Sequence, residues 1–184
     1  MIDLTAVRRL LEAFEPGPHT HDVDSLAQTL ALIADKADPF DRTDYDPGHI
    51  TASAIVLSPD GESVVLVNHA RVGLWIQPGG HVEPDDATLV DAARREVEEE
   101  TGITLPQTKS PSLVRVDVHE IPPFKNEPGH WHHDLTFGFR TEVRQIDPHG
   151  DSEWAWCEVP DLDRWNVEPA LQRSVLRVRT LHQQ

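Results

Sequence analysis

The sequence has few of the features that mark secreted or membrane proteins. It contains a single cysteine, Cys157, so no disulfide can form within the chain, and we interpret this residue as a packed thiol in a strand. It also lacks an apolar run long enough to cross a bilayer, and its N-terminal residues lack the apolar core and cleavage site of a signal peptide. We therefore expect a cytoplasmic protein that does not enter membranes.

Positive charge is scarce as well. The chain has 16 Lys and Arg residues against 32 Asp and Glu residues, which gives a net charge of −16. Such a charge opposes nonspecific binding to nucleic acid polymers and to anionic membrane surfaces. We therefore expect a small-molecule partner, and a phosphorylated substrate would have to arrive with metal ions or meet them in the protein.

Apolar periodicity divides the sequence into helices and strands. Stripes at helical spacing predict helices over residues 4–14, 23–37 and 168–182. Apolar runs and alternation predict strands over residues 50–57, 64–67, 113–119, 135–140 and 153–159. This mixture indicates an α/β protein in which residues 1–48 form a helical extension packed on a core domain of residues 49–184. The stripes of the terminal helices are also compatible with the surface of a homodimer.

The most informative stretch begins with a glycine pair, Gly79 and Gly80, that follows a short apolar run. Two consecutive glycines allow a sharp turn after a strand and expose backbone groups to a ligand. A helix is expected next, capped at its start by Asp85 or Asp86 and ended by Gly102 in the left-handed conformation. Small and aliphatic residues recur along this helix at the spacing expected for packing against a sheet.

Acidic residues cluster near the end of this expected helix. Glu96 stands three residues before Glu99 and four before Glu100, so these side chains project from one face of the helix. With Glu98 they make four acids in five positions, and the neighbouring Arg95 can neutralise only part of their charge. A solvated acidic face is the alternative, but the glycine pair upstream favours a site for a hard divalent cation, with Mg²⁺ as the natural candidate.

The spacing of these residues resembles the Nudix box, G-x5-E-x7-R-E-U-x-E-E-x-G-U, in which U is an aliphatic residue. Residues 95–103 match every fixed position of the second half of this pattern. In the first half, 14 residues separate Gly80 from Arg95 where the pattern has 13, and Asp86 stands where the glutamate should be. A one-residue insertion near residues 84–86 accounts for both departures.

The resemblance to Nudix hydrolases implies a fold and an activity. The fold would be an α/β/α sandwich with a mixed sheet between helices. The activity would be that of a pyrophosphohydrolase, which cleaves a diphosphate linkage in a nucleoside diphosphate derivative or a related phosphorylated small molecule. Residues that match the box would then hold Mg²⁺ or Mn²⁺, namely Glu96, Glu99, Glu100 and the carbonyl of Gly80, while Arg95 would orient the acids.

The resemblance also draws attention to Glu153, in the strand expected over residues 153–159. Nudix proteins often supply an additional acid to the metals, or a general base, from this position. The alternative is an exposed strand charge without a role. Because clustered acids titrate as a group, the sequence leaves open which acid removes the proton from water.

Histidines gather around residue 130, at His130, His132 and His133. A transition-metal site is one interpretation, but His132 and His133 would point to opposite faces of a strand, and no Cys or Glu-x-x-His spacing supports zinc. We therefore interpret these residues as polar residues of a loop that are dispensable for the metal-dependent chemistry. A single histidine could still contact a substrate phosphate, and His81, directly after Gly80, is a candidate.

Two aromatic residues, Phe124 and Trp131, fall between the expected strands, where they could stack on a base or ring of the substrate or simply pack. A regulatory Nudix domain that binds a nucleotide without hydrolysis is the alternative function. Such domains usually have a degraded helix motif, whereas the acids here are intact, so we favour hydrolysis. An isomerase of isopentenyl diphosphate would need a reactive cysteine in the site, and Cys157 is poorly placed for that role.

Overall fold

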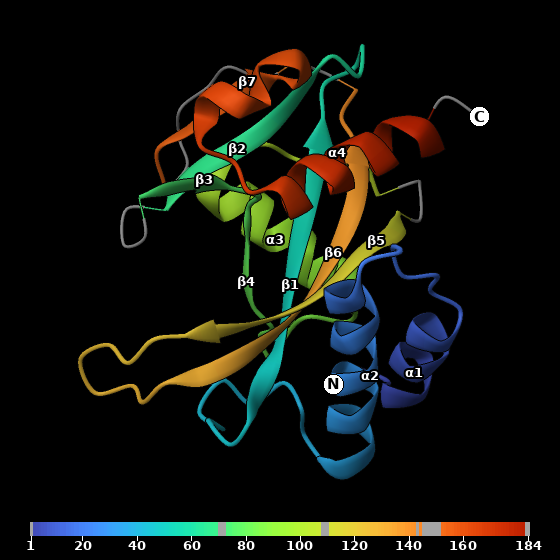
Figure 1. Ribbon diagram of the computed structural model, residues 1–184, viewed down its shortest axis with the longest axis vertical. Coiled ribbons are helices and arrows are strands. Elements are labelled where there is room, and N and C mark those ends of the chain that lie inside the picture. The colour runs from blue at the N-terminus through green and yellow to red at the C-terminus, as the bar shows by residue number, and fades with distance from the viewer. Residues whose placement is uncertain (1, 70–72, 108–110, 143, 145–151, 183–184) are drawn as a thin grey trace.

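A computed structural model describes residues 2–69, 73–107, 111–142, 144 and 152–182. Figure 1 shows them as a curled mixed sheet with helices on both of its faces. The expected α/β/α sandwich is therefore confirmed. No helix in these ranges is long and apolar enough to cross a membrane.

The sheet is organised around β1 (Gly48–Leu57), which lies in the middle of the strand order β3-β2-β1-β6-β5. β1 runs parallel to β6 (His130–Arg140) along its whole length. It also pairs antiparallel with β2 (Ser63–His69) at its end and with β4 (Gly79–His81) near its middle. The remaining strands pair antiparallel, β3 and β7 with β2 and β5 with β6. Their bounds are β3 (Leu74–Ile76), β5 (Ser112–Ile121) and β7 (Trp154–Glu158).

Helices cover both faces of this sheet, and β1 separates two apolar cores because its side chains alternate between the faces. Ala52, Ala54 and Val56 belong to the core shared with α1 (Leu4–Glu12), α2 (Thr20–Asp35) and α3 (Leu89–Thr101). Ile55 and Leu57 belong to the core shared with the 3-10 helix η1 (Val159–Trp165) and with α4 (Pro169–Leu181). We call these sides the α3 face and the α4 face. In Figure 1, α4 crosses in front of the sheet and α3 lies behind it.

Most helix ends agree with the sequence, and one does not. The side chain of Asp3 caps α1 by accepting a hydrogen bond from the Thr5 amide at 2.8 Å. Gly102 ends α3 with φ of 70°, as expected for a left-handed cap. The expected cap of α3 by Asp85 or Asp86 is wrong, because the hydroxyl of Thr88 accepts from an amide in the first turn and caps the helix.

Two strand expectations need comment. β6 begins at His130, five residues earlier than the expected start at residue 135, so the histidine-rich segment is a strand and its interpretation as a loop is wrong. Cys157 is confirmed as a packed thiol of β7, since it is fully buried and its burial raises the pKa of the thiol to about 11.

The N-terminal helices pack against the sheet beside β5 and β6 (Figure 1). Val7 and Leu11 of α1 and Leu32 and Ile33 of α2 are buried in the same core as Ile50 of β1. Residues 1–48 are thus tied to the sheet by shared apolar contacts. Their separation from a core domain of residues 49–184 stays a prediction.

Candidate active site

The glycine pair lies in β4, between β1 and the helix α3. Gly79 pairs with Ser53 and Gly80 with Ala52 in an antiparallel register. A Cβ atom on Gly79 would lie 2.7 Å from the Cα of Ser53, and one on Gly80 would lie 2.7 Å from the carboxyl carbon of Glu96. The expected sharp turn at this pair is therefore wrong: the glycines continue as a short strand, and they are needed because neighbouring atoms approach so closely.

The acids of α3 surround this pair. Glu96 lies against Gly80, and its side chain is 14% exposed. The amide of Gly79 donates a hydrogen bond of 3.0 Å to the Glu100 carboxylate. Glu99 projects outward, with 54% of its side chain exposed. Glu96 and Glu100 therefore lie beside the sheet, and Glu99 reaches into solvent.

Arg95 joins the acids to the segment that follows β4. Its guanidinium donates to Glu96 at 2.8 Å and to Glu99 at 3.0 Å, both from the same nitrogen. A second nitrogen donates to the carbonyl of His81 at 2.8 Å, and the group also forms a two-point contact with Asp86 at 3.1 and 3.2 Å. Burial alone would lower the pKa of Arg95, but its bonds to Asp86 and Glu96 raise it, so the charge is fixed.

Asp86 stands at the position of the first acid of the Nudix box. Its side chain is 6% exposed, pairs with Arg95, and accepts a hydrogen bond from the Glu83 amide at 2.8 Å. A shorter acid in a segment with one extra residue therefore supports the connection between β4 and α3.

Burial and mutual repulsion make the cluster receptive to a cation. Burial raises the pKa of Glu100 to about 7, and the charges of Glu96 and Glu99 add to this effect. Burial also raises the pKa of Glu96, although Arg95 opposes this shift. Carboxylates and a backbone carbonyl are the donor types that a hard divalent cation prefers, so the residues fit such an ion by their chemistry. A bound cation would compete with Arg95 for two of these acids.

Glu153 lies just ahead of β7 and pairs with β2. Its carboxylate accepts a hydrogen bond of 2.7 Å from the side-chain amide of Asn68. The amide of the preceding residue, Ser152, donates to the carbonyl of Glu100 at 3.3 Å. The chain before β7 is therefore attached to the end of α3.

The histidines have a different arrangement from the one expected. His49 of β1, His81 of β4 and His132 of β6 lie on the α4 face, with ring centroids 4.9 to 5.2 Å apart, and His130 stacks on His49 at 5.1 Å. Burial lowers the pKa of His81 to about 4 and that of His132 to about 2, so both rings are neutral near pH 7. His133 points to the other face, as expected.

The three predicted substrate contacts are dispersed. The ring of His81 points into the histidine group on the α4 face. Trp131 stands two residues before His133 in β6, so the two side chains point to the same face, and His133 hydrogen-bonds Thr29 of α2 at 3.1 Å. Trp131 therefore lies on the α3 face with Gly80 and is 42% exposed. Phe124 is exposed in the turn between β5 and β6. The structure thus brings none of these three side chains together.

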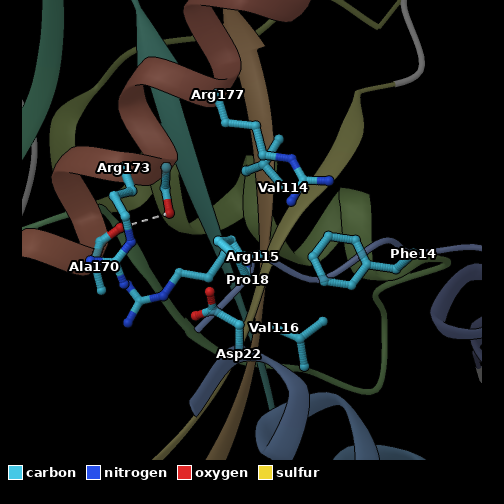
Figure 2. A pocket seen from close by; sticks show the side chains of 11 residues that line it. Phe14, Pro18, Asp22, Val114, Arg115, Val116, Ala170, Arg173 and Arg177 are labelled. Atoms are coloured by element: carbon cyan, nitrogen blue, oxygen red, sulfur yellow. Dashed lines mark hydrogen bonds between the residues drawn. The ribbon is translucent and has the colours of Figure 1, made fainter. Parts of the chain in front are cut away.

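Two cavities help to define the surroundings. One of about 420 Å³ borders Asp86 and is lined also by Phe40 and Arg42. Another of about 200 Å³ lies between the α1–α2 connection, β5 and α4, where Figure 2 shows Arg115 and Arg173 among its lining side chains. The second cavity is lined by no residue of the glycine pair or the acid cluster, so we do not place the reaction there.

The glycine pair of β4 faces α3, where Arg95 bonds Glu96 and Glu99 and where the amide of Gly79 bonds Glu100. The class of protein that the resemblance implied is an enzyme that acts on phosphoric anhydrides. The pattern of the NUDIX domain matches residues 47–178. The chain is 35% identical over 133 residues to the phosphatase NudJ of Escherichia coli K12. The matched region covers 70% of this chain and 75% of that protein. The chain therefore belongs to the Nudix family, and the expectation of a Nudix-type pyrophosphohydrolase is confirmed.

Solved structures show the same fold. The NUDIX domain of Shewanella oneidensis NrtR in complex with ADP ribose matches with a TM-score of 0.55 and 18% identity, over 85% of this chain and 97% of that one. The MutT protein of Bacillus halodurans matches with a TM-score of 0.50 and 23% identity, over 71% and 81% of the two chains. Members of the family generally require divalent metal ions.

Proposed function

We propose that this protein hydrolyses a diphosphate linkage in a nucleoside diphosphate derivative or a related phosphorylated small molecule, with Mg²⁺ or Mn²⁺ as its cofactor. The observation that carries this proposal is the contact of Gly79 and Gly80 with Glu100 and Glu96 in the presence of Arg95. Membership of the Nudix family and the likeness to NudJ, which is named a phosphatase, support it.

The carboxylates of Glu96, Glu99 and Glu100 and the carbonyl of Gly80 are the proposed metal ligands. A divalent cation bound there would neutralise substrate phosphates and lower the pKa of bound water. The protein's own contribution is to hold the acids in place: Gly79 orients Glu100, and Gly80 leaves room for the Glu96 carboxylate. A net charge of −16 would otherwise repel an anionic substrate.

Arg95 is a positioning residue in this proposal. It holds Glu96 and Glu99 together and anchors the segment after β4 through His81 and Asp86. Among Glu96, Glu99 and Glu100, Glu99 is the acid most open to solvent, and Glu153 is an exposed acid outside α3. We therefore propose Glu99 and Glu96 as acids of the reaction and Glu153 as a supplementary one.

Substrate contacts follow from the positions of the aromatic side chains. Trp131 is exposed on the face that carries Gly80, so its ring is available for stacking on a base or other ring. Phe124 lies in the connection between β5 and β6 and is exposed. The ring of His81 faces the other side of the sheet, so its proposed contact with phosphate is the weakest of the three. The possible homodimer stays a prediction.

A substrate panel tests this function. The full chain is incubated with nucleoside triphosphates, nucleotide sugars, dinucleotides and diphosphorylated compounds without a nucleoside, in Mg²⁺, in Mn²⁺ and in excess chelator. We expect phosphate-containing products from at least one class, only when a divalent cation is present. Tight binding of a nucleotide without product in any metal would instead favour the regulatory alternative.

A further inference from the structure

Three histidines from three strands converge on the α4 face of the sheet. The ligand nitrogens of His49, His81 and His132 all lie within 4.8 Å of one another. In the described structure, these three side chains come close enough together to hold one metal ion without any movement. The strand register produces this arrangement. His49 of β1 pairs with His132 of β6, and His81 of β4 pairs with Thr51, two residues further along β1.

His49 provides independent support for a ligand. Its side chain is 1% exposed, and its Nδ1 lies 3.2 Å from the carbonyl of Asp44, which can only accept a hydrogen bond. Nδ1 must therefore carry the proton, and Nε2 has a free lone pair. This buried Nε2 has no hydrogen-bond partner among the described residues. An unsatisfied buried acceptor is costly, and a backbone carbonyl on the opposite ring nitrogen is the usual arrangement of a metal-binding histidine.

His130 adds a fourth imidazole, and its Nδ1, like that of His49, faces a backbone carbonyl. The Nδ1 of His130 lies 2.9 Å from the carbonyl of Pro128, which can only accept a hydrogen bond, so Nδ1 is the donor and Nε2 is left to accept a hydrogen bond or to bind an ion. This Nε2 accepts a hydrogen bond of 3.2 Å from the Nε2 of His132, and a bound ion would replace the shared proton. Two nitrogens bound tetrahedrally to one zinc ion at about 2.0–2.1 Å are roughly 3.3 Å apart. The two rings therefore already have the separation of ligands that share an ion.

We propose that His49, His81 and His132, with His130 as a fourth ligand, form a binding site for a divalent transition-metal ion of the zinc class. Imidazole nitrogen favours such ions, whereas carboxylate and carbonyl oxygens favour Mg²⁺. The site is thus chemically distinct from the acid cluster on the other face. His81 and His132 are partly exposed, which gives an ion a path from solvent.

The bound ion would connect β1, β4 and β6 at one point. Because His81 directly follows Gly80 and its carbonyl accepts a bond from Arg95, this connection would hold β4 in place beneath the acid cluster. The ion is therefore a positioning element, with no contact to the reacting phosphates. The positive charge of Arg42 disfavours a cation beside His49, and the negative charge of Asp41 favours it, because both side chains interact electrostatically with His49.

Metal binding by the full chain tests the proposal. The protein is stripped with a chelator, desalted, and titrated with Zn²⁺ in a large excess of Mg²⁺, which keeps the acids of α3 occupied. We expect one tightly held zinc ion per chain by elemental analysis, and a rise in melting temperature upon its addition. With Co²⁺ in place of Zn²⁺, we expect visible absorption bands of a nitrogen-ligated ion. Absence of zinc retention by the wild-type chain would overturn the proposal.

Variants separate this site from the acid cluster. His132→Asn and His81→Asn should each weaken zinc binding by more than the roughly 10–100-fold that is typical for loss of an outer-shell partner. His133→Asn is the matched control, because it changes the neighbouring histidine on the opposite face and should leave zinc binding unchanged. Glu99→Gln should lose hydrolysis and keep the zinc ion. The proposal would be contradicted if zinc binding persisted in both His132→Asn and His81→Asn, or if it were lost in Glu99→Gln. Neither result bears on whether the enzyme cleaves diphosphates.

Discussion

Gly80 and His81 are neighbours in β4, yet they belong to two chemically different regions. Gly80 faces α3, where the proposed oxygen ligands Glu96, Glu99 and Glu100 lie on one helix, Glu96 three and four residues before the other two. His81 faces the other side, where the proposed nitrogen ligands come from three strands that are distant along the chain. The acids are neighbours in one continuous sequence motif, whereas the histidines come together only when the strands pair in the sheet. One three-residue strand therefore positions both.

The largest expected effect concerns the acid side of this comparison. If Glu99 is an acid of the reaction, Glu99→Gln should lower kcat by roughly 100-fold or more, because metal-assisted charge stabilisation contributes several kcal/mol to catalysis. The side chain is exposed, so the fold should survive, as circular dichroism would show. Near-normal turnover in saturating Mg²⁺ would remove Glu99 from the mechanism.

The glycine pair offers a second test, because its two members approach different neighbours. In Gly80→Ala the three atoms nearest to the new methyl group belong to the Glu96 carboxylate, which can turn away, so kcat should fall while stability changes little. In Gly79→Ala it meets the backbone of Ser53, so the free energy of unfolding should fall by about 1–3 kcal/mol. Urea denaturation and steady-state kinetics on both variants check this contrast. Equal losses of stability would mean that Glu96 cannot move independently of the strand.

The sequence indicated much of the acid site because a helix converts sequence spacing directly into a shared face. Glu96, Glu99 and Glu100 lie on one helix, as predicted, and Gly102 ends this helix as expected. The cap was misassigned because two aspartates precede the helix and the burial of Asp86 against Arg95 could not be read locally. The role of Thr88 was therefore hidden by a tertiary ion pair.

The histidine group could not be predicted, because strand pairing decides which residues meet. Nothing local signals that His49 stands beside His132, since their contact depends on the parallel register of β1 and β6. The early start of β6 was missed for the same reason: its polar residues are satisfied by other strands. The buried carboxylate of Asp134, for example, accepts hydrogen bonds from Thr51 at 3.0 Å and Ser53 at 2.6 Å. Alternating histidines at positions 130 and 132 were the available signal.

The two regions should also respond to pH in opposite ways in metal-free protein. The pKa of Glu100 is about 7 in the folded chain against 4.5 for a free carboxyl, so the folded state binds more protons and stability should fall as pH rises from about 4.5 to about 7. The pKa of His81 is about 4 against 6.5, so its contribution to stability should rise as pH increases from about 4 to about 6.5.

Stability profiles of two variants separate these contributions. Denaturation of chelator-treated protein at several pH values should show a steeper gain of stability with pH in Glu100→Gln than in the wild-type chain. In His81→Asn the gain should be smaller than in the wild type. Parallel profiles for all three proteins would show that neither side chain carries the expected shift.

The smallest expected effect concerns Glu153, which tests whether the acid site extends beyond the helix. Its carboxylate contacts Asn68, and the residue before it contacts Glu100, so Glu153 borders the site without belonging to α3. In Glu153→Gln the charge is lost and the shape is kept. A metal ligand should then reveal itself by a higher Mg²⁺ requirement, and a general base by a lower kcat at saturating Mg²⁺ with an altered pH profile.

The matched control for this test is Asn68→Ala, which removes the partner of Glu153 and keeps its charge. If Glu153 acts on the metal or the water, Asn68→Ala should cause the milder defect of the same kind, because the carboxylate is still present but less well held. If Glu153→Gln changed neither the Mg²⁺ requirement nor kcat and its pH profile, Glu153 would be an exposed charge without a role in the reaction. The supplementary acid would then have to be sought at Asp147 or Asp151, which lie outside the described residues.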